Sequence, residues 1–442
     1  MSAPSFAPTV IRRIRITEWE YYPPEQGSVM EGIFLSEDSH TRQVVEHLSN
    51  AGILHIEELR HGLRIRATSW VGRITLDNIE ITIEPKILGL RLLTLVRYAY
   101  GLRNLDLHGV SSFDLSEMSF LDLLIHQLVA EVDELTRRGL RREYIRDDAD
   151  LTLPRGRIDI RRYARDLGRV STTLPCSFHP RTIDTTLNQT LYWGLRHGSK
   201  FTSDPTLRAT LMNRCLLFEE DISSGRLNRR SLQMARQNIT RLTAAYTPAL
   251  RLIELLMGDE GVNLEEETDS LNVPGFLFDM NRFFQALLSR FLSDNLPEFI
   301  VMDEQILRGM MTYDPLHNPQ HKLMPAPRPD FVVMQGSKMV AVLDAKYRDL
   351  WEKPLPREML YQLATYALSQ QERRIATILY PTLNSSASEV HIMLKDMVHG
   401  SHAGRVILRP VNMNNLADLI DGDRNEEERR CHAKSLAFGS EG

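Results

Sequence analysis

The chain has 442 residues, of which 42% are hydrophobic, so it can bury substantial cores and is too long for one ordinary domain. Its net charge of −5 argues against nucleic-acid binding through overall positive charge, so any such contact needs a local patch. The three cysteines, Cys176, Cys215 and Cys431, are far apart, which excludes a disulfide framework or paired zinc spacing. No apolar run approaches the roughly 20 residues of a membrane span, and no signal peptide is evident. We therefore expect a cytoplasmic protein without membrane contact.

Residues 1–88 are predicted to form a β-rich N-terminal module with one helix. Residues 11–20 alternate in part, residues 41–51 have helical spacing that ends near Gly52, and residues 63–87 contain successive alternating strands. Alternation of this kind is typical of strands that are buried on one face. A purely structural module explains it, and the alternative is a surface that docks a partner or contacts DNA.

Residues 89–267 are predicted to form a mainly helical middle domain. Apolar residues recur at spacings of three and four in residues 88–102, 120–140 and 184–201, with glycines near the ends as plausible caps. Such spacing indicates amphipathic helices that pack against one another.

A run of arginines lies within this middle domain. Its members are Arg137, Arg138, Arg141, Arg142, Arg155, Arg157, Arg161 and Arg162. A charge run of this kind is typical of a solvated helix face, and the alternative is a patch that contacts phosphate or a partner. The acidic residues Glu143, Asp147, Asp148 and Asp150 are interspersed and favour an ion-pair network.

The third predicted domain covers residues 268–421, after a polar, acidic and turn-rich boundary at residues 265–275. A helix, a strand, a turn-rich insertion, an apolar hairpin, a second helix and further strands follow, an order typical of an α/β sheet. His317 and His321 in the insertion are not a zinc pair, because Pro319 interrupts any helix that could align them. Residues 422–442 are charged and poor in aromatics, which predicts a frayed tail.

The apolar hairpin carries the candidate site. Residues 331–334 and 339–343 are short apolar runs separated by a turn, with Asp330 before the first run and Asp344 and Lys346 after the second. Being two apart, Asp344 and Lys346 share a face of the strand. A plain two-residue turn would put Asp330 and Asp344 on opposite faces. We therefore predict a three-residue loop or a bulge that brings the two carboxylates opposite each other, about 5 Å apart.

Two neighbouring buried carboxylates are costly unless a cation neutralises them, and oxygen ligands at a strand end suit Mg²⁺. This chemistry favours hydrolysis at phosphorus, with Lys346 orienting the nucleophile or stabilising the transition state. The helix that begins near Pro356 puts Gln362 and Tyr366 one turn apart on one face, where they could hold the nucleophile, Lys346 or the DNA backbone. A second acidic-x-Lys triplet, at residues 84–86, has neither hairpin nor helix and is interpreted as a solvated strand end.

Together, Pro329-Asp330, Asp344-Ala345-Lys346 and the pair of Gln362 and Tyr366 resemble the PD-(D/E)XK nuclease superfamily. The segments VLDAKYRD and LYQLATYAL are similar to the active-site strand and helix of McrC, the nuclease subunit of McrBC-type modification-dependent restriction systems. The resemblance implies a multidomain α+β protein that cleaves DNA with Mg²⁺. It also implies that Asp330 and Asp344 are metal ligands and Lys346 is the catalytic lysine. Many such nucleases carry a glutamate on the preceding helix, where this chain has Gln285, a weaker ligand.

The chain contains no Gly-x-x-x-x-Gly-Lys-Ser/Thr motif, so any nucleotide hydrolysis must come from another subunit. The resemblance implies that this partner is a hexameric AAA+ GTPase of the McrB type. Double-strand cleavage needs two active sites, so we expect two nuclease subunits to pair. Two hypotheses follow. The first is an endonuclease subunit. The second is a non-catalytic adaptor that has a nuclease fold and stimulates the motor, and Gln285 in place of a glutamate favours this second hypothesis.

Overall fold

Two compact units make up the mixed α+β chain. The computed structural model describes residues 12–36, 38–87, 89–105, 118–165, 172–219, 221–223, 225–257, 275–307, 310–324, 326–370, 373–396, 398–422 and 426–439. The first unit comprises residues 1–104, 110–123 and 258–442, and the second comprises residues 105–109 and 124–257. The predicted domain boundary at residues 265–275 lies outside the described residues, apart from Gly275. No helix in the described ranges is long and apolar enough to cross a bilayer.

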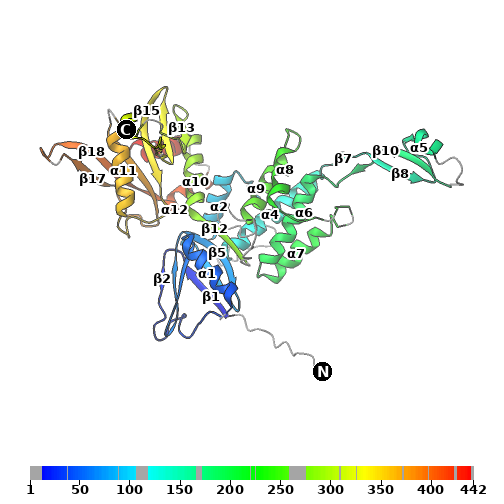
Figure 1. Ribbon diagram of the computed structural model, residues 1–442, viewed down its shortest axis with the longest axis horizontal. Coiled ribbons are helices and arrows are strands. Elements are labelled where there is room, and N and C mark those ends of the chain that lie inside the picture. The colour runs from blue at the N-terminus through cyan, green and yellow to red at the C-terminus, as the bar shows by residue number, and fades with distance from the viewer. Residues whose placement is uncertain are drawn as a thin grey trace. The chain divides into compact units, whose positions relative to one another are not determined.

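The N-terminal part of the first unit contains two sheets and one covering helix, as Figure 1 shows in blue. Its elements are β1 (Arg12–Thr17), β2 (Tyr21–Tyr22), α1 (Ser39–Asn50), β3 (Leu54–Leu59), β4 (Gly62–Ala67), β5 (Trp70–Leu76) and β6 (Ile79–Glu84). The sheet orders are β1-β6-β5-β12 and β2-β4-β3, where β12 (Gly275–Asp279) comes from much later in the chain. Alternation decides which face is buried, since Ile79, Ile81 and Ile83 of β6 all point into the core.

A six-stranded sheet dominates the rest of the first unit. Its order is β13-β14-β15-β16-β18-β17. The strands are β13 (Ile300–Asp303), β14 (Phe331–Gln335), β15 (Lys338–Ala345), β16 (Ile375–Thr382), β17 (Val390–Lys395) and β18 (His402–Asn412). The helices are α2 (Gly89–Tyr100), α10 (Met280–Asn295), α11 (Arg357–Ser369), α12 (Met413–Asp421) and α13 (Glu426–Phe438), with a short 3-10 turn, η2 (Pro315–His317).

The two faces of this sheet are covered by different helices. Leu363 and Tyr366 of α11 pack with Val342 of β15 in one core cluster, so α11 covers the face to which Val342 points (Figure 1). From Ala341 onward, residues of odd number on β15 point the other way. There the ring of Tyr347, just beyond β15, contacts the ring of Phe284 on α10 with centroids 5.9 Å apart. Asp344 and Lys346 therefore belong to the α11 face.

The predicted frayed tail is wrong, because residues 426–438 form the helix α13. Ala433, Leu436 and Ala437 are buried, and the carbonyl oxygen of Leu436 accepts a hydrogen bond of 2.6 Å from Nη1 of Arg409. Arg409 is itself buried and paired with Glu389 at 2.6 Å. Although the segment is mostly polar, these three apolar residues form a narrow stripe that packs α13 against α10 and β15.

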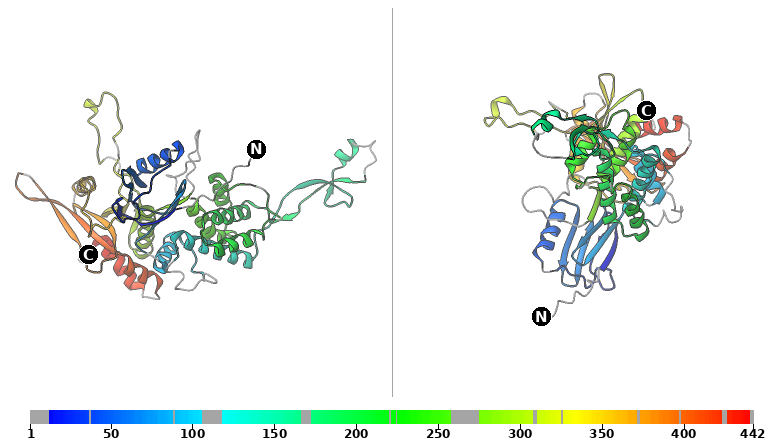
Figure 2. Two further views of the ribbon diagram at one scale, coloured as in Figure 1. Left: turned by 90° about the horizontal axis from the view of Figure 1, so that it is seen from below. Right: turned by 90° about the vertical axis from the view of Figure 1, so that its right-hand side faces the viewer.

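The second unit is a group of helices with a long projection. Its helices are α4 (Phe120–Arg138, from Leu124 onward), α6 (Thr186–Phe201), α7 (Pro205–Cys215), α8 (Arg229–Gln237), η1 (Ala244–Tyr246) and α9 (Thr247–Leu256). The projection, here called the arm, spans residues 141–183. It contains β7 (Glu143–Tyr144), β8 (Asp147–Leu151), β9 (Arg157–Ile158), α5 (Ile160–Arg165), β10 (Leu174–Phe178) and β11 (Arg181–Thr182), and it extends away from the helices of its unit (Figures 1 and 2).

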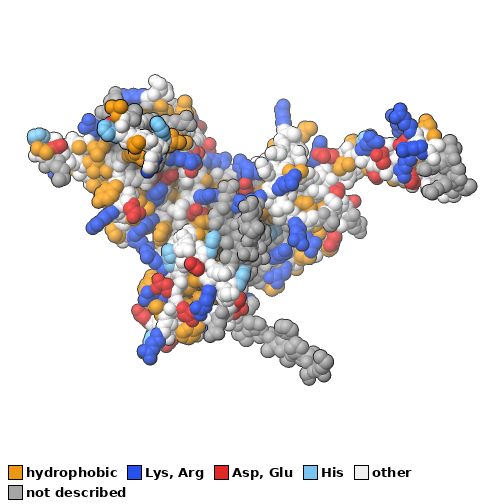
Figure 3. Space-filling model, in the orientation of Figure 1, with side chains coloured by type: hydrophobic (Ala, Val, Ile, Leu, Met, Phe, Trp, Pro, Cys, Tyr) orange, Lys and Arg blue, Asp and Glu red, His pale blue; other side chains and the backbone are white. Residues whose placement is uncertain are grey.

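The expected solvated helix face holds for four of the eight arginines, since Arg137 and Arg138 lie on α4 and Arg161 and Arg162 lie on α5. It is wrong for the other four, because Arg157 lies on β9 and Arg141, Arg142 and Arg155 lie outside helices and strands. The pairs are β7 with β11, and β10 with both β8 and β9. The expected ion pairs exist: Arg146 meets Asp148 at 3.3 Å and Arg162 meets Asp150 at 2.8 Å. Figure 3 shows Lys and Arg side chains gathered near the end of the arm.

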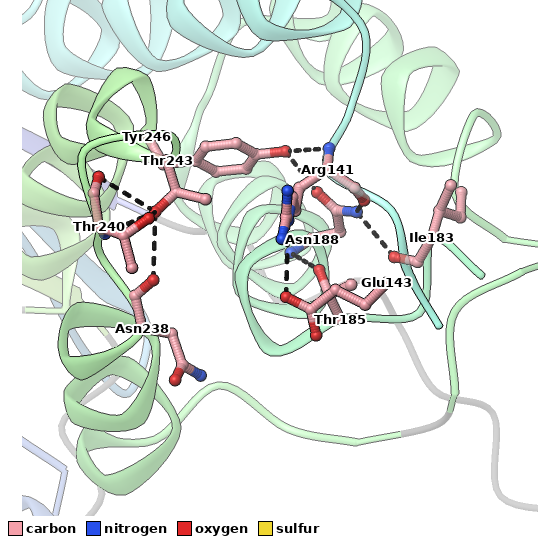
Figure 4. A network of polar contacts seen from close by, with 9 residues as sticks. All are labelled: Arg141, Glu143, Ile183, Thr185, Asn188, Asn238, Thr240, Thr243 and Tyr246. Atoms are coloured by element: carbon pink, nitrogen blue, oxygen red, sulfur yellow. Dashed lines mark hydrogen bonds and ion pairs between the residues drawn. The ribbon is translucent and has the colours of Figure 1, made fainter. Parts of the chain in front are cut away.

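Asn188 on α6 fixes both strands of the arm at its base (Figure 4). Its Nδ2 donates to the carbonyl oxygens of Arg141 at 2.8 Å and Ile183 at 2.7 Å. Its Oδ1 accepts from the hydroxyl of Tyr246 at 2.8 Å, and that hydroxyl accepts from the backbone N–H of Arg141 at 2.7 Å. Because Asn188 is fully buried, each of these bonds replaces one to water and fixes the direction of the arm.

Glu18 joins the N-terminal sheets to the six-stranded sheet inside the first unit. Its Oε1 accepts from the hydroxyl of Tyr347 and from the backbone N–H of Lys86, both at 2.8 Å. Burial raises the pKa of Glu18 to about 7, although both hydrogen bonds lower it. The carboxyl is fully buried, so its neutral form is favoured in the folded chain up to nearly neutral pH.

Replacing Asn188 by leucine is predicted to destabilise the second unit by about 2–4 kcal/mol, because two backbone carbonyls and one hydroxyl lose their partner. Proteolysis should also cut near residues 141 and 183 faster than in the wild type. Tyr246→Phe, which removes a single hydroxyl, serves as the milder control. Unchanged cleavage at the base of the arm in Asn188→Leu would contradict this role.

The stability of the first unit is predicted to fall as the pH rises from about 4.5 to about 7. The unfolded chain releases the Glu18 proton near 4.5 and the folded chain near 7, so the folded state binds more protons in this window. Glu18→Gln keeps the acceptor oxygen without the ionisation. Between pH 4.5 and about 7, the free energy of unfolding of the wild type should therefore fall by about 3 kcal/mol relative to that of Glu18→Gln. Urea unfolding of both proteins at several pH values measures this difference, and parallel curves would refute it.

Candidate active site

The hairpin of β14 and β15 has the irregular register that the candidate site requires. Gln335 pairs with Lys338 across a two-residue turn, and the register shifts between Val333 and Met334, so that Phe331 pairs with Leu343. One extra residue on β15, next to Ala341, produces this shift. The predicted bulge is confirmed. Continuing the register by one residue brings Asp330 level with Asp344.

The three charged side chains of the hairpin meet at one point. Nζ of Lys346 lies 3.0 Å from Oδ2 of Asp344 and 3.6 Å from Oδ2 of Asp330. The backbone N–H of Ala345 also donates to Oδ2 of Asp330 at 2.7 Å, which fixes that carboxylate against the end of β15. Asp344 is only 2% exposed, whereas the side chains of Asp330 and Lys346 are 17% and 28% exposed, so the cluster keeps limited access to water.

Burial and mutual repulsion shift the ionisation of this cluster. Burial, followed by the charge of Asp344, raises the pKa of Asp330 to about 6. Burial alone would lower the pKa of Lys346, but Asp344 and Asp330 outweigh it and raise that pKa. The lysine therefore stays a cation beside two carboxylates that compete for positive charge.

The donor set fits a hard divalent cation. Oδ1 of Asp344 is buried and has no hydrogen-bond partner within the described part of the chain. Oδ1 of Asp330 has one long contact, 3.4 Å from Nε2 of Gln285 on α10. A buried carboxylate oxygen without a donor is costly, and an ion such as Mg²⁺ held by one or two carboxylates plus water removes that cost. Three or more His, Cys, Asp or Glu side chains do not cluster anywhere in the described ranges, so other oxygens must complete the shell.

Gln362 and Tyr366 lie on the face of α11 that packs against the sheet. Nε2 of Gln362 donates to the Tyr366 hydroxyl at 2.9 Å, and Tyr366 is buried. Burial raises the pKa of Tyr366, and the nearby charges of Asp344 and Asp330 raise it further. Neither side chain hydrogen-bonds to the carboxylates or to Lys346 among the described contacts. The structure thus brings the pair near the cluster without giving it a direct contact there.

Two residues at this end of the sheet were missed by the sequence argument. Tyr347 directly follows Lys346 and is buried on the opposite face, and Glu18 holds its hydroxyl from 329 positions away. Nothing in the local sequence around Glu18 marks it, because its importance comes only from the contact across the fold. For Tyr347, the only indication in the local sequence is its place as an aromatic residue directly after the Asp344-Ala345-Lys346 triplet.

A family model described as "McrBC 5-methylcytosine restriction system component" matches residues 65–381 of this chain. A search of curated proteins finds no match. The fold is similar to a chain in a structure from Thermococcus gammatolerans, described as a half-complex from a tetradecameric assembly of McrB AAA+ hexamers with bound McrC. That similarity has a TM-score of 0.61 at 20% identity and covers 96% of this chain and 99% of that chain.

A second structure, of the Thermococcus gammatolerans McrBC complex, matches with a TM-score of 0.44 at 18% identity. It covers 64% of this chain and 88% of that chain.

Replacing Gln285 by glutamate is predicted to tighten Mg²⁺ binding roughly tenfold, because a third anionic oxygen joins the two carboxylates. Without the cation, the added charge should lower the melting temperature through repulsion of Asp330. Calorimetric titration with Mg²⁺, and melting in the presence of a chelator, measure the two effects. Gln305→Glu, an acidic change at a partly exposed position outside the cluster, is the control. Equal Mg²⁺ affinity in all three proteins would contradict the proximity of Gln285 to a metal site.

Proposed function

This chain belongs to the family of McrBC 5-methylcytosine restriction system components, and on that premise we propose that it is the Mg²⁺-dependent endonuclease subunit of such a system. The observation that carries the proposal is the meeting of Asp330, Asp344 and Lys346 at the end of β15, where a buried oxygen of Asp344 has no donor among the described residues. Two carboxylates and one ammonium gathered away from water are costly to a fold. Hydrolysis of a DNA phosphodiester gives each of them a role.

Asp330 and Asp344 are proposed to hold the metal. A bound divalent ion would supply positive charge to a phosphate and make water more acidic. The N–H of Ala345 holds Asp330 in place, and Oδ2 of Asp344 is held 3.0 Å from the ammonium of Lys346. Both ligands are therefore positioned before an ion arrives, which lowers the cost of binding.

Lys346 is proposed to stabilise the charge that develops on the phosphate. Its ammonium lies within 4 Å of both carboxylates, and its raised pKa keeps it protonated. Gln362 and Tyr366 are proposed to support the water or the DNA backbone from the α11 side. Their mutual hydrogen bond fixes the hydroxyl of Tyr366 near the carboxylates.

An AAA+ GTPase of the McrB type is the proposed partner. The chain has no phosphate-binding loop of its own, and the similar McrC chain is described as bound to McrB AAA+ hexamers. The arm offers a surface for such a partner, since Tyr144, Leu153 and Ile160 are exposed on it beside its arginines. Pairing of two nuclease subunits would supply one active site per DNA strand. Three free cysteines agree with action in the reducing cytoplasm.

The adaptor hypothesis rests on Gln285, whose amide replaces the expected glutamate and contacts Asp330 only at 3.4 Å. An adaptor would not need the two carboxylates to share one ammonium. The common contacts of Lys346 with Asp330 and Asp344 therefore favour the endonuclease.

Asp344→Ala and Lys346→Ala are each predicted to reduce plasmid cleavage by the complete complex at least about a hundredfold, because each removes a charge from the cluster. The assay follows nicking and linearisation with Mg²⁺ and GTP. Lys395→Ala, on β17 at the other edge of the sheet from β13, serves as a control for folding and assembly. Cleavage by both active-site variants at the wild-type rate would eliminate the site. No cleavage by any form, with the partner still stimulated, would favour the adaptor.

A further inference from the structure

A pocket in the first unit lies beside the end of β15 and is separate from the carboxylate cluster. It is lined by Glu18, Trp19, Lys86, Arg348 and Lys353, among others, and contains about 410 Å³ of space free of protein atoms, part of it open to solvent. Residues that follow β15, β16 and β18 form one wall. Pockets outside the carboxyl ends of parallel strands are common ligand sites in α/β sheets. We call it the Trp19 pocket.

Three residues that line the Trp19 pocket each keep one buried polar atom without a hydrogen bond. These atoms are Oε2 of Glu18, Nε1 of Trp19 and Nε of Arg348, none of which has a partner in the described part of the structure. Oε1 of Glu18 already accepts two hydrogen bonds, so a proton on the neutral carboxyl belongs on Oε2. All three groups are then hydrogen-bond donors that need an acceptor.

Positive charge also gathers around this pocket. The Arg348 guanidinium and the Lys353 ammonium lie 5.9 Å and 5.6 Å from the ring centroid of Trp19. Burial lowers the pKa of Lys353, and the charges of Lys86 and Arg348 lower it further. An anion in the pocket would relieve this repulsion.

Two acidic side chains near the pocket, those of Asp349 and Glu352, already have hydrogen-bond or ion-pair partners. Asp349 accepts hydrogen bonds from the Thr382 hydroxyl at 2.8 Å and from the backbone N–H of Trp351 at 2.9 Å. Glu352 pairs with Lys86 at 3.5 Å. Donors and cations remain, which together favour a ligand made of acceptor oxygens with negative charge.

The backbone of Trp19 is strained, with φ of +62° in the left-handed region that bulky residues rarely adopt. Such strain is often kept at functional positions. Here it is held by the hydrogen bond of 2.6 Å that Lys353 donates to the Trp19 carbonyl oxygen.

We propose that the Trp19 pocket binds one phosphate group of the DNA strand, close to the phosphate that is held at Asp330 and Asp344. The proposal rests on the proposed nuclease function. Arg348 follows Lys346 by two residues, about 7 Å of chain, so a strand bound at the carboxylates has further phosphates within reach. A free oxyanion has the same chemistry and is the competing source.

Thermal unfolding of the full chain tests the pocket without DNA. Sodium phosphate is compared with sodium chloride at equal ionic strength and at pH 6, below the pKa of Glu18, since a ligand of the folded state raises the melting temperature. We expect phosphate to stabilise the wild type, and this stabilisation to be lost in Arg348→Ala and reduced in Trp19→Phe, which removes only the indole N–H. Arg348→Lys, which keeps the charge, should recover part of it. Arg60→Ala, at an exposed turn of the same unit, should behave as wild type.

DNA binding then decides the source of the phosphate. Affinity for a duplex is measured against salt concentration in the presence of a chelator, with the AAA+ partner added if the chain alone does not bind. Loss of one phosphate contact should reduce the slope of log K against log salt by about 1 in Arg348→Ala and leave Arg60→Ala unchanged.

An unchanged slope together with a lost phosphate effect would overturn the DNA assignment and leave a site for a free oxyanion. No phosphate effect in the wild type would overturn the pocket itself. The melting experiment involves no cleavage, so it distinguishes failure of this proposal from failure of the nuclease function.

Discussion

The ammonium of Lys346 between the carboxylates of Asp330 and Asp344 is the interaction on which the rest of this structure depends. Two acidic groups in a buried site repel each other, and the raised pKa of Asp330 records that cost. One lysine at 3.0 and 3.6 Å offsets only part of it, since a buried oxygen of Asp344 finds no donor in the part of the chain that the structure describes. The chain can therefore fold with this site, but two carboxylates share only one ammonium. The remaining negative charge favours binding of a cation.

The arrangement depends on a single extra residue in β15. Without the bulge, Asp330 would lie on the far face of the sheet from Asp344 and the cluster could not form. The bulge lies among fully buried strands, where Phe331, Val333 and Leu343 hold the register. Packing of the hydrophobic core therefore determines the distance between two charged groups.

The same strand also connects the site to the N-terminal sheets. Lys346 faces α11, whereas Tyr347 faces the opposite side and is held by Glu18. Two adjacent residues just beyond the end of β15 thus belong to two environments, one with the proposed chemistry and one with the Trp19 pocket. The family model matches residues 65–381. It therefore includes β14, β15 and the pocket residues that follow β15, but not Glu18 and Trp19.

The sequence alone determined the pieces with local causes. Alternation predicted the N-terminal strands, spacing of three and four predicted α2, α4 and α6, and the order of hairpin, triplet and helix identified Asp330, Asp344 and Lys346. Because successive residues of a strand point to opposite faces, placing Asp330 and Asp344 on one face also required a bulge or a longer turn. The predicted strands, helices and bulge are confirmed, because each depends on residues within a few positions of one another. The roles of Asp330, Asp344 and Lys346 stay predictions.

Only the tertiary structure decided the rest. The polar segment of residues 426–438 becomes a helix because α10 and β15 pack against its narrow apolar stripe and Arg409 binds the carbonyl oxygen of Leu436. Most of the arginine run lies in the arm, which forms because β8 and β10 pair. Asn188 and Glu18 matter through partners that lie up to 329 positions away. A buried hydrogen bond between distant residues leaves no periodic mark in either segment, so its energy becomes visible only when the chain has folded.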